Sequence, residues 1–183
     1  MKNVLFILII TLFTFNIYAA NPKVEIQTNV GNMTIELYPD KAPTTVNNFL
    51  GYVNSGFYKD TAFHRIINNF MIQGGGYKFN KAGKMDLKKT KPAIKNEGKA
   101  NKLKNDRGTI AMARTGSPHS ATSQFFINHK NNKFLDSSDS KWGYAVFGKL
   151  VEGEKTLDKI ATTSTKPDDT PVKKIIIKSI KKL

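Results

Sequence analysis

The feature that most restricts the fold of this chain is a series of eight short strand-like runs. Residues 24–28 and 33–37 each alternate apolar and polar side chains, and the turn residues 29–32 separate them. This is the pattern of a β-hairpin. The other strand-like runs lie at residues 62–67, 70–73, 108–114, 123–128, 145–151 and 172–180.

Only two segments have the spacing of an amphipathic helix. Apolar residues recur at helical spacing from Val46 to Val53, and this pattern stops at Gly56. Leu157 and Ile160 follow Glu154, whose negative charge is favourable at a helix N-terminus. We therefore predict a mainly β protein, a closed or nearly closed barrel with two helical caps, because closure removes exposed strand edges.

The N-terminal segment has the pattern of a secretory signal peptide. Lys2 precedes an apolar run at residues 4–15, and the segment ends in the small residues Ala19 and Ala20. The apolar run is shorter than the roughly 20 residues that a membrane-spanning helix needs. We predict a signal peptide at residues 1–20, cleaved after Ala19 or Ala20, and one domain at residues 21–183 without membrane attachment. An uncleaved membrane anchor is the alternative.

The composition gives few clues to a partner. The chain has 29 basic and 14 acidic residues and a net charge of +15, which suits either a solvated cationic surface or an anionic partner. Residues 74–104 are rich in Gly, Lys and Asn, and we interpret them as a long surface loop. Because the chain contains no cysteine, its stability must come from a packed core rather than from disulfides.

Several classes of enzyme lack their sequence signatures here. There is no G-x-S-x-G motif for a hydrolytic serine, and no H-E-x-x-H spacing for a metal among only three histidines. The run Gln73-Gly74-Gly75-Gly76 is not followed by the Gly-Lys-Ser/Thr of a phosphate-binding loop. We therefore expect no metal and no cofactor, and no specific binding of nucleic acid.

Two strand-like segments carry candidate site residues. Alternation in residues 63–67 places Arg65 on one face with Phe63 and Ile67, and we interpret His64, on the other face, as a structural side chain. An arginine between apolar neighbours must reach water or present its donors to a ligand. In residues 123–127, alternation places Gln124 with Phe126 and leaves Phe125 and Ile127 on the opposite face.

Four motifs together resemble the cyclophilin family of peptidyl-prolyl cis-trans isomerases. They are Phe63-His64-Arg65-Ile66-Ile67, Phe70-Met71-Ile72-Gln73-Gly74-Gly75, Ser123-Gln124-Phe125-Phe126-Ile127 and Val146-Phe147-Gly148-Lys149, and the resemblance runs from about Val24 to Ile180. It implies a closed eight-stranded antiparallel β-barrel capped by two α-helices, in agreement with the count of runs above.

The resemblance also implies a role for each matching residue. Arg65 would be the catalytic cation and Gln73 its polar partner. Ala113 and Arg114 would lie where the backbone of the substrate pairs with the enzyme, and Gln124 would line the adjoining groove. The remaining substrate-binding positions would be Phe70, Met71, Phe126, Phe134, Leu135 and Tyr144.

The chain departs from many eukaryotic members at four of the matched positions. Phe134 replaces a tryptophan, Tyr144 a histidine, Arg114 an asparagine and Gly76 an aspartate. At these positions the chain resembles the bacterial branch of the family. Together with the leader, this resemblance predicts a periplasmic protein. Since the tryptophan donates a hydrogen bond to cyclosporin in the family, the resemblance implies weak binding of cyclosporin here.

The function implied by the resemblance is isomerisation of X-Pro bonds during the folding of exported proteins. The expected partners are proline-containing peptides and unfolded chains, and we expect a monomer. A holdase-type chaperone, which binds unfolded chains without isomerising them, is one alternative. A polyanion-binding module that uses the lysines of residues 78–104 is another.

Overall fold

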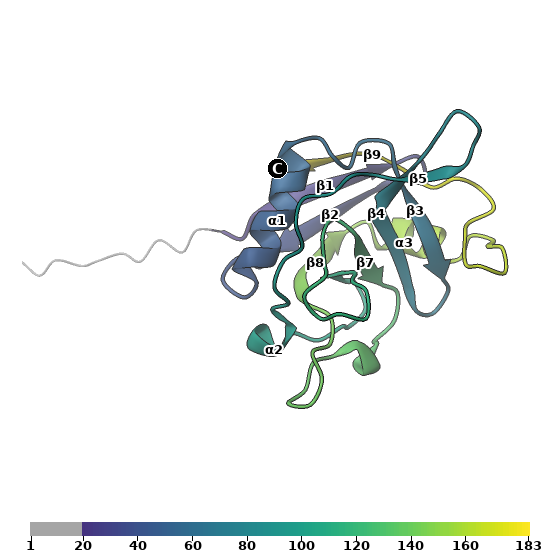
Figure 1. Ribbon diagram of the computed structural model, residues 1–183. Coiled ribbons are helices and arrows are strands. Elements are labelled where there is room, and N and C mark those ends of the chain that lie inside the picture. Colours follow the sequence, from purple (N-terminus) through teal and green to yellow (C-terminus); the bar gives the residue numbers. More distant parts are fainter. Residues whose placement is uncertain (1–19) are drawn as a thin grey trace, which may run out of the picture.

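The computed structural model describes residues 20–183, and its central element is a closed antiparallel barrel (Figure 1). Neighbouring strands follow the order β3-β9-β1-β2-β8-β6-β7-β4, and a direct β3–β4 pairing closes the ring. The predicted eight-stranded closed barrel is thus confirmed. Its strands are β1 (Lys23–Thr28), β2 (Asn32–Leu37), β3 (Thr61–Ile67), β4 (Met71–Phe79), β6 (Thr109–Met112), β7 (Phe125–Asn128), β8 (Val146–Glu152) and β9 (Ile176–Lys182).

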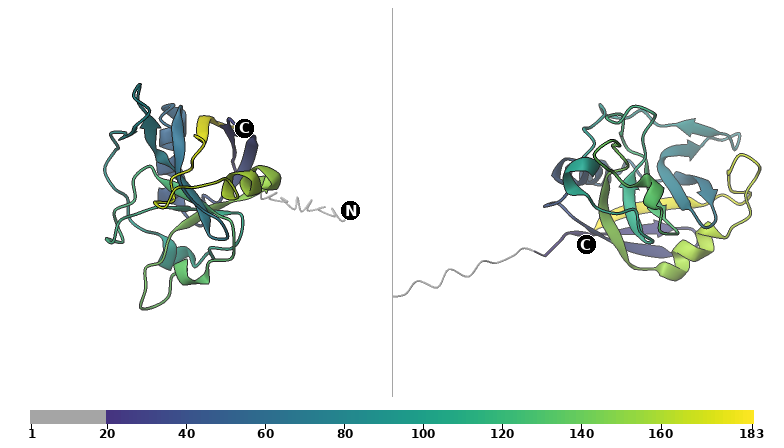
Figure 2. Two further views of the ribbon diagram at one scale, coloured as in Figure 1. Left: turned by 90° about the vertical axis from the view of Figure 1, so that its right-hand side faces the viewer. Right: turned by 90° about the horizontal axis from the view of Figure 1, so that it is seen from below.

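Both predicted helices are present. In Figures 1 and 2, α1 (Pro43–Asn54) and α3 (Glu154–Ala161) lie on different sides of the barrel. Proline occupies the first turn of α1, where no backbone donor is needed. The carboxylate of Glu97 accepts the backbone N–H groups of Thr44 and Thr45 at 3.0 and 2.8 Å, so a distant residue caps this helix.

The prediction of a long surface loop at residues 74–104 is wrong in part. β4 continues through Gly74, Gly75 and Gly76, a short strand β5 (Met85–Leu87) pairs with its end, and α2 (Gly98–Asn101) follows. The glycines allow aromatic rings to approach the strand. A Cβ on Gly75, whose φ is +82°, would lie 2.8 Å from a ring carbon of Phe125, which is why these residues lack side chains.

Side chains of the strands and helices fill two apolar clusters. The larger one occupies the barrel interior, where the ring of Phe49 lies 5.7 Å from that of Phe125 and 5.2 Å from that of Phe147. The smaller one contains Met71, Ala111, Ala113, Phe126, Leu135 and Val146. Phe125 and Ile127 belong to the interior and Phe126 to the smaller cluster, as the alternation in residues 123–127 predicts.

The predicted signal peptide falls almost entirely on residues 1–19, which lie outside the described part of the chain. No helix within residues 20–183 is long and apolar enough to cross a membrane.

Candidate active site

The smaller apolar cluster forms one wall of a cavity of about 110 Å³. The cavity brings together nine of the eleven site residues that the sequence predicts. Two of them carry guanidinium groups, one carries an amide, and the others are apolar or aromatic. They are Arg65, Phe70, Met71, Gln73, Ala113, Arg114, Phe126, Leu135 and Tyr144.

Arg65 reaches this cavity because β3 is irregular. The β3–β4 register shifts between Phe63 and Arg65. As a result Phe63 and Ile66 both enter the barrel interior, whereas Arg65 lines the cavity and Ile67 packs on the smaller cluster. The prediction that Arg65 shares a face with Phe63 is wrong, because a bulge of this kind reverses the alternation of side chains.

The guanidinium of Arg65 is held at its Nε edge by a carboxylate. Nε donates to Oδ2 of Asp169 at 3.2 Å, and both side chains remain partly exposed. Asp169 is itself fixed to β3, since its backbone oxygen accepts the N–H of Ile66 at 2.9 Å. The contact at Nε leaves the two terminal nitrogens of Arg65 available to a ligand in the cavity.

Gln73 lies directly opposite Arg65 in the register of β3 and β4. Its Nε2 donates to Oε1 of Gln124 at 3.0 Å, so the amide pairs with Gln124 as well as facing the cavity. Gln124 does not line the first cavity. It lines a second one of about 160 Å³, which shares Gln73, Ala113 and Arg114 with the first. This arrangement agrees with the expectation that Gln124 lines an adjoining groove.

The apolar walls are set by buried side chains and a constrained turn. Met71, Phe126 and Leu135 are at least nine-tenths buried. Phe70 is placed by the turn between β3 and β4, where its backbone oxygen accepts the N–H of His129 and the Nδ2–H of Asn132, both at 2.9 Å. Fixed walls of this kind give the cavity a defined shape before a ligand arrives.

Arg114 lies at the cavity rim and is hydrogen-bonded to the backbone of two loops. Its Nε and Nη2 both donate to the backbone oxygen of Gly143, at 3.1 and 3.0 Å, and its Nη1 donates to the backbone oxygen of Thr115 at 2.9 Å. The guanidinium also lies 4.4 Å from the ring centroid of Tyr144. These contacts use much of its donor capacity on neighbouring loops, which leaves Arg65 as the cation better placed to serve a ligand.

Phe134 lies at the rim and not in the cavity. It is the middle residue of the short 3₁₀ turn Lys133–Leu135, and its side chain is 61% exposed and stacks on Phe70 with 5.4 Å between ring centroids. It can therefore contact a ligand that extends beyond the cavity, but a phenyl ring has no hydrogen-bond donor to offer.

His64 lies outside the cavity. Burial lowers the pKa of His64 to about 4, and the charge of Arg65 acts in the same direction. At neutral pH its ring is therefore uncharged, and within residues 20–183 its buried Nδ1 has no hydrogen-bond partner. Residues 20–183 contain no group of three or more histidine and acidic side chains that could hold a metal ion.

The family is decided by comparison with known proteins. The model of the family "Cyclophilin type peptidyl-prolyl cis-trans isomerase/CLD" matches residues 23–182, nearly the whole of the described chain. The chain belongs to the cyclophilin family. It is accordingly a cyclophilin-type peptidyl-prolyl cis-trans isomerase, and the fold described above is that of a cyclophilin.

Bacterial peptidyl-prolyl cis-trans isomerases are among its similar relatives. A peptidyl-prolyl cis-trans isomerase of Acinetobacter baylyi is 55% identical over 146 residues, which cover 80% of this chain and 75% of the relative. Peptidyl-prolyl cis-trans isomerase B of Escherichia coli is 49% identical over 164 residues, covering 86% and 97%. The crystal structure of a Cryptosporidium parvum cyclophilin is 32% identical, with a TM-score of 0.74 and coverage of 89% and 98%.

Sequence reasoning missed the contacts that position the cyclophilin site. Asp169 lies 104 residues from Arg65, and the local run Asp168-Asp169-Thr170-Pro171 indicates only a turn. His129 and Asn132 also act at a distance, by holding the backbone oxygen of Phe70. Because each of these contacts depends on tertiary packing, no pattern of spacing along the chain could have identified it.

Proposed function

We propose that this cyclophilin is exported to the periplasm and there accelerates the folding of proteins whose folding rate is limited by X-Pro isomerisation. The proposal of export rests on the apolar leader and its small-residue end at Ala19 and Ala20. The substrate class is supported by a second Cryptosporidium parvum cyclophilin structure, described as determined in the presence of the dipeptide Ala-Pro. That chain is 33% identical to this one, with a TM-score of 0.72 and coverage of 86% and 96%.

The observation that carries the catalytic mechanism is a fixed guanidinium at the edge of an apolar cavity. X-Pro bonds favour trans by only about 0.5–1 kcal/mol but rotate in tens to hundreds of seconds, because rotation breaks amide resonance. In the twisted transition state the imide nitrogen regains a lone pair and can accept a hydrogen bond. A terminal nitrogen of Arg65 donates that bond while Met71, Phe126 and Leu135 hold the proline ring.

This contact is catalytic because it exists mainly in the transition state. The planar imide nitrogen of either ground-state isomer is a poor acceptor, so donation from Arg65 lowers the barrier more than it strengthens binding. The reaction forms and breaks no covalent bond, and it needs neither an acid–base pair nor a nucleophile. His64, which is neutral and lies outside the cavity, has no part in it.

The proposal of an exported isomerase is tested in two steps. Mass spectrometry of the protein recovered from the periplasm should show an N-terminus at Ala20 or Asn21, and recovery of an intact Met1 would contradict export with cleavage. The wild type should then accelerate the refolding of a substrate protein whose slow refolding phase is limited by prolyl isomerisation, and Arg65→Ala should not.

A parallel aggregation assay separates the isomerase from a holdase. If Arg65→Ala accelerates proline-limited refolding as well as the wild type does, catalysis by Arg65 is refuted. If both proteins suppress aggregation equally without accelerating refolding, the protein acts as a holdase, because the apolar cavity alone is sufficient for binding.

A further inference from the structure

A lysine-rich segment covers one side of the barrel. Residues 78–95, here called the lysine strap, contain seven lysines and one acidic residue, Asp86. All but one of these lysines are exposed. Within residues 20–183 none of them forms an ion pair, since the ion pairs there involve Arg65, Lys104, Arg107 and His129. The strap therefore presents a positive charge that the described chain does not neutralise.

Contacts with aromatic rings restrict two ammonium groups of the strap. The Nζ of Lys88 lies 4.4 Å from the ring centroid of Phe57 and donates to the backbone oxygen of the same residue. The Nζ of Lys91 lies 5.3 Å from the ring centroid of Tyr52, whose hydroxyl accepts the backbone N–H of Lys91 at 2.9 Å. Side chains that are already restricted lose less conformational entropy when they bind a partner.

The positive charges of the strap also act on one another. Burial is the main cause of a lowered pKa of Lys88, and the neighbouring charge of Lys78 lowers it further, against the opposing effect of Asp60. An anionic group placed near these lysines would relieve this repulsion.

The strap begins where the substrate groove ends. The cavity that contains Arg65 is here called the proline cavity, because we propose that it holds the proline ring. The second cavity, lined by Gln124, adjoins the proline cavity through shared residues. A Cβ on Gly76 would lie 2.5 Å from Cγ of Gln124, and the backbone oxygen of Gly76 accepts the N–H of Lys88 at 2.9 Å. A polypeptide that runs from the proline cavity over Gln124 therefore meets Lys88 and its neighbours next.

The distance along this route can be estimated from β4. Gln73 faces the proline cavity and Lys78 belongs to the strap, so the two are five residues apart on one strand, or about 17 Å at about 3.3 Å per residue. An extended substrate covers this distance in about five residues.

We infer that the lysine strap selects prolyl substrates that carry acidic residues about four to six positions from the proline, on the side that runs over Gln124. The inference rests on the proposed function, since it assumes a polypeptide in the groove. Carboxylates four to six residues from the proline would reach the strap, and each would gain a modest attraction to its exposed lysines that added salt screens.

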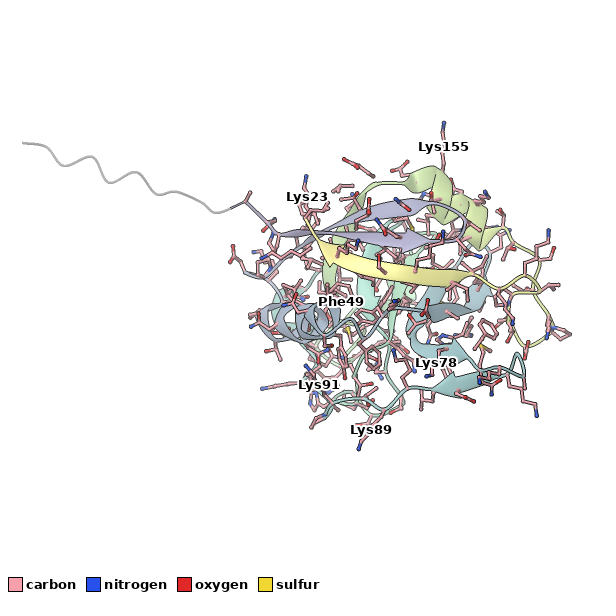
Figure 3. The ribbon with its side chains drawn as sticks, turned by 90° about the horizontal axis from the view of Figure 1, so that it is seen from above. Lys23, Phe49, Lys78, Lys89, Lys91 and Lys155 are labelled. Carbon is pink, nitrogen blue, oxygen red and sulfur yellow. The ribbon has the colours of Figure 1, made fainter. Side chains whose placement is uncertain are left out.

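The experiment compares three peptides of equal length with one central Ala-Pro bond. One is neutral, one has two glutamates four and five residues before the proline, and one has them four and five residues after it. The strap variant is the double substitution Lys89→Gln and Lys91→Gln. The control is Lys23→Gln with Lys155→Gln, which removes the same charge from exposed positions on the other side of the molecule (Figure 3).

NMR titration at 50 mM and 500 mM NaCl gives the dissociation constants, and exchange spectroscopy gives the isomerisation rates. At low salt, the acidic peptide whose glutamates lie on the side that runs over Gln124 should bind wild type about three- to tenfold more tightly than the neutral peptide. The strap variant should lose this preference and the control should keep it, and 500 mM salt should abolish it. All three proteins should isomerise the neutral peptide at similar rates.

Other results would overturn the inference without affecting the proposed function. These are equal affinity for all three peptides, or an acidic preference that both variants lose equally, which would be a general effect of net charge. The inference also fails if the strap variant keeps its peptide affinities but loses binding to a single-stranded oligonucleotide or to vesicles containing phosphatidylglycerol. If the wild-type protein does not isomerise the neutral peptide, that result would instead count against the proposed function.

Discussion

The contact between Asp169 and Arg65 gives a prediction about a positioning residue. Asp169 does not line the proline cavity, but its carboxylate accepts the Nε–H of Arg65 at 3.2 Å. Substitution by glycine removes the acceptor. It should introduce little backbone strain, because Asp169 has a φ of +64° and glycine adopts this conformation readily. Asparagine also tolerates this conformation and keeps an acceptor oxygen, so Asp169→Asn should restore the contact.

The size of the effect follows from the exposure of the pair. The side chains of Arg65 and Asp169 are 44% and 37% exposed, and ion pairs of this kind are worth about 0.2–1 kcal/mol. Because this contact orients the guanidinium, Asp169→Gly should lower kcat by up to about fivefold at unchanged KM, and Asp169→Asn should lose less.

Exchange spectroscopy with a proline peptide measures both constants, and the ¹⁵N–¹H signal of Arg65 Nε reports the hydrogen bond itself. Asp168→Gly is the matched control, because Asp168 is adjacent and accepts from Thr170 rather than from Arg65. Wild-type kcat in a folded Asp169→Gly protein would refute the reasoning. So would equal losses in the glycine and asparagine variants, since the amide oxygen can accept the same bond.

Three further predictions concern other residues. Phe126→Ala should weaken peptide binding and catalysis together, by opening a buried wall of the cavity, and a loss confined to kcat would contradict this. Phe134→Trp should tighten inhibition by cyclosporin about five- to 150-fold by supplying a donor worth about 1–3 kcal/mol, which an inhibition assay checks and an unchanged constant disproves. Since the pKa of His64 falls to about 4 on folding, the unfolded state binds more protons between about pH 6.5 and pH 4. The free energy of unfolding should therefore decrease by at most about 3 kcal/mol as the pH is lowered from about 6.5 to about 4. Urea unfolding should show a smaller loss for His64→Phe, and an identical pH dependence would refute this assignment.

Patterns of period two were sufficient to predict the eight barrel strands, whereas the site residues were predicted from the resemblance of four motifs to the cyclophilin family. Phe125, Phe126 and Ile127 lie on the faces that simple alternation gives them, because β7 is regular. The same rule failed at Arg65, because the shifted register of β3 inserts a bulge that the sequence does not mark. The side chain reached the predicted cavity by a different geometry.

Glycine was the other source of error. Gly74, Gly75 and Gly76 resemble turn residues in the sequence, yet they lie inside β4. Their small size is required by Phe63, Phe125 and Gln124, which come from other strands and loops. The contacts of Arg65 with Asp169 and of Phe70 with His129 are likewise made between distant parts of the chain. Such requirements become visible only when the chain is folded.

The central claim is that Arg65 stabilises the twisted imide rather than the bound peptide. The most direct test is the rate of cis–trans exchange of a proline peptide that saturates the enzyme, measured by NMR for wild type, Arg65→Ala and Arg65→Lys. We predict a loss of at least ~100-fold in Arg65→Ala, the scale of one preorganised donor worth about 2.7–4 kcal/mol. The dissociation constant should change much less, and lysine should restore little because it lacks the planar fork. A folded Arg65→Ala protein that exchanges the bound peptide at near the wild-type rate would contradict the account.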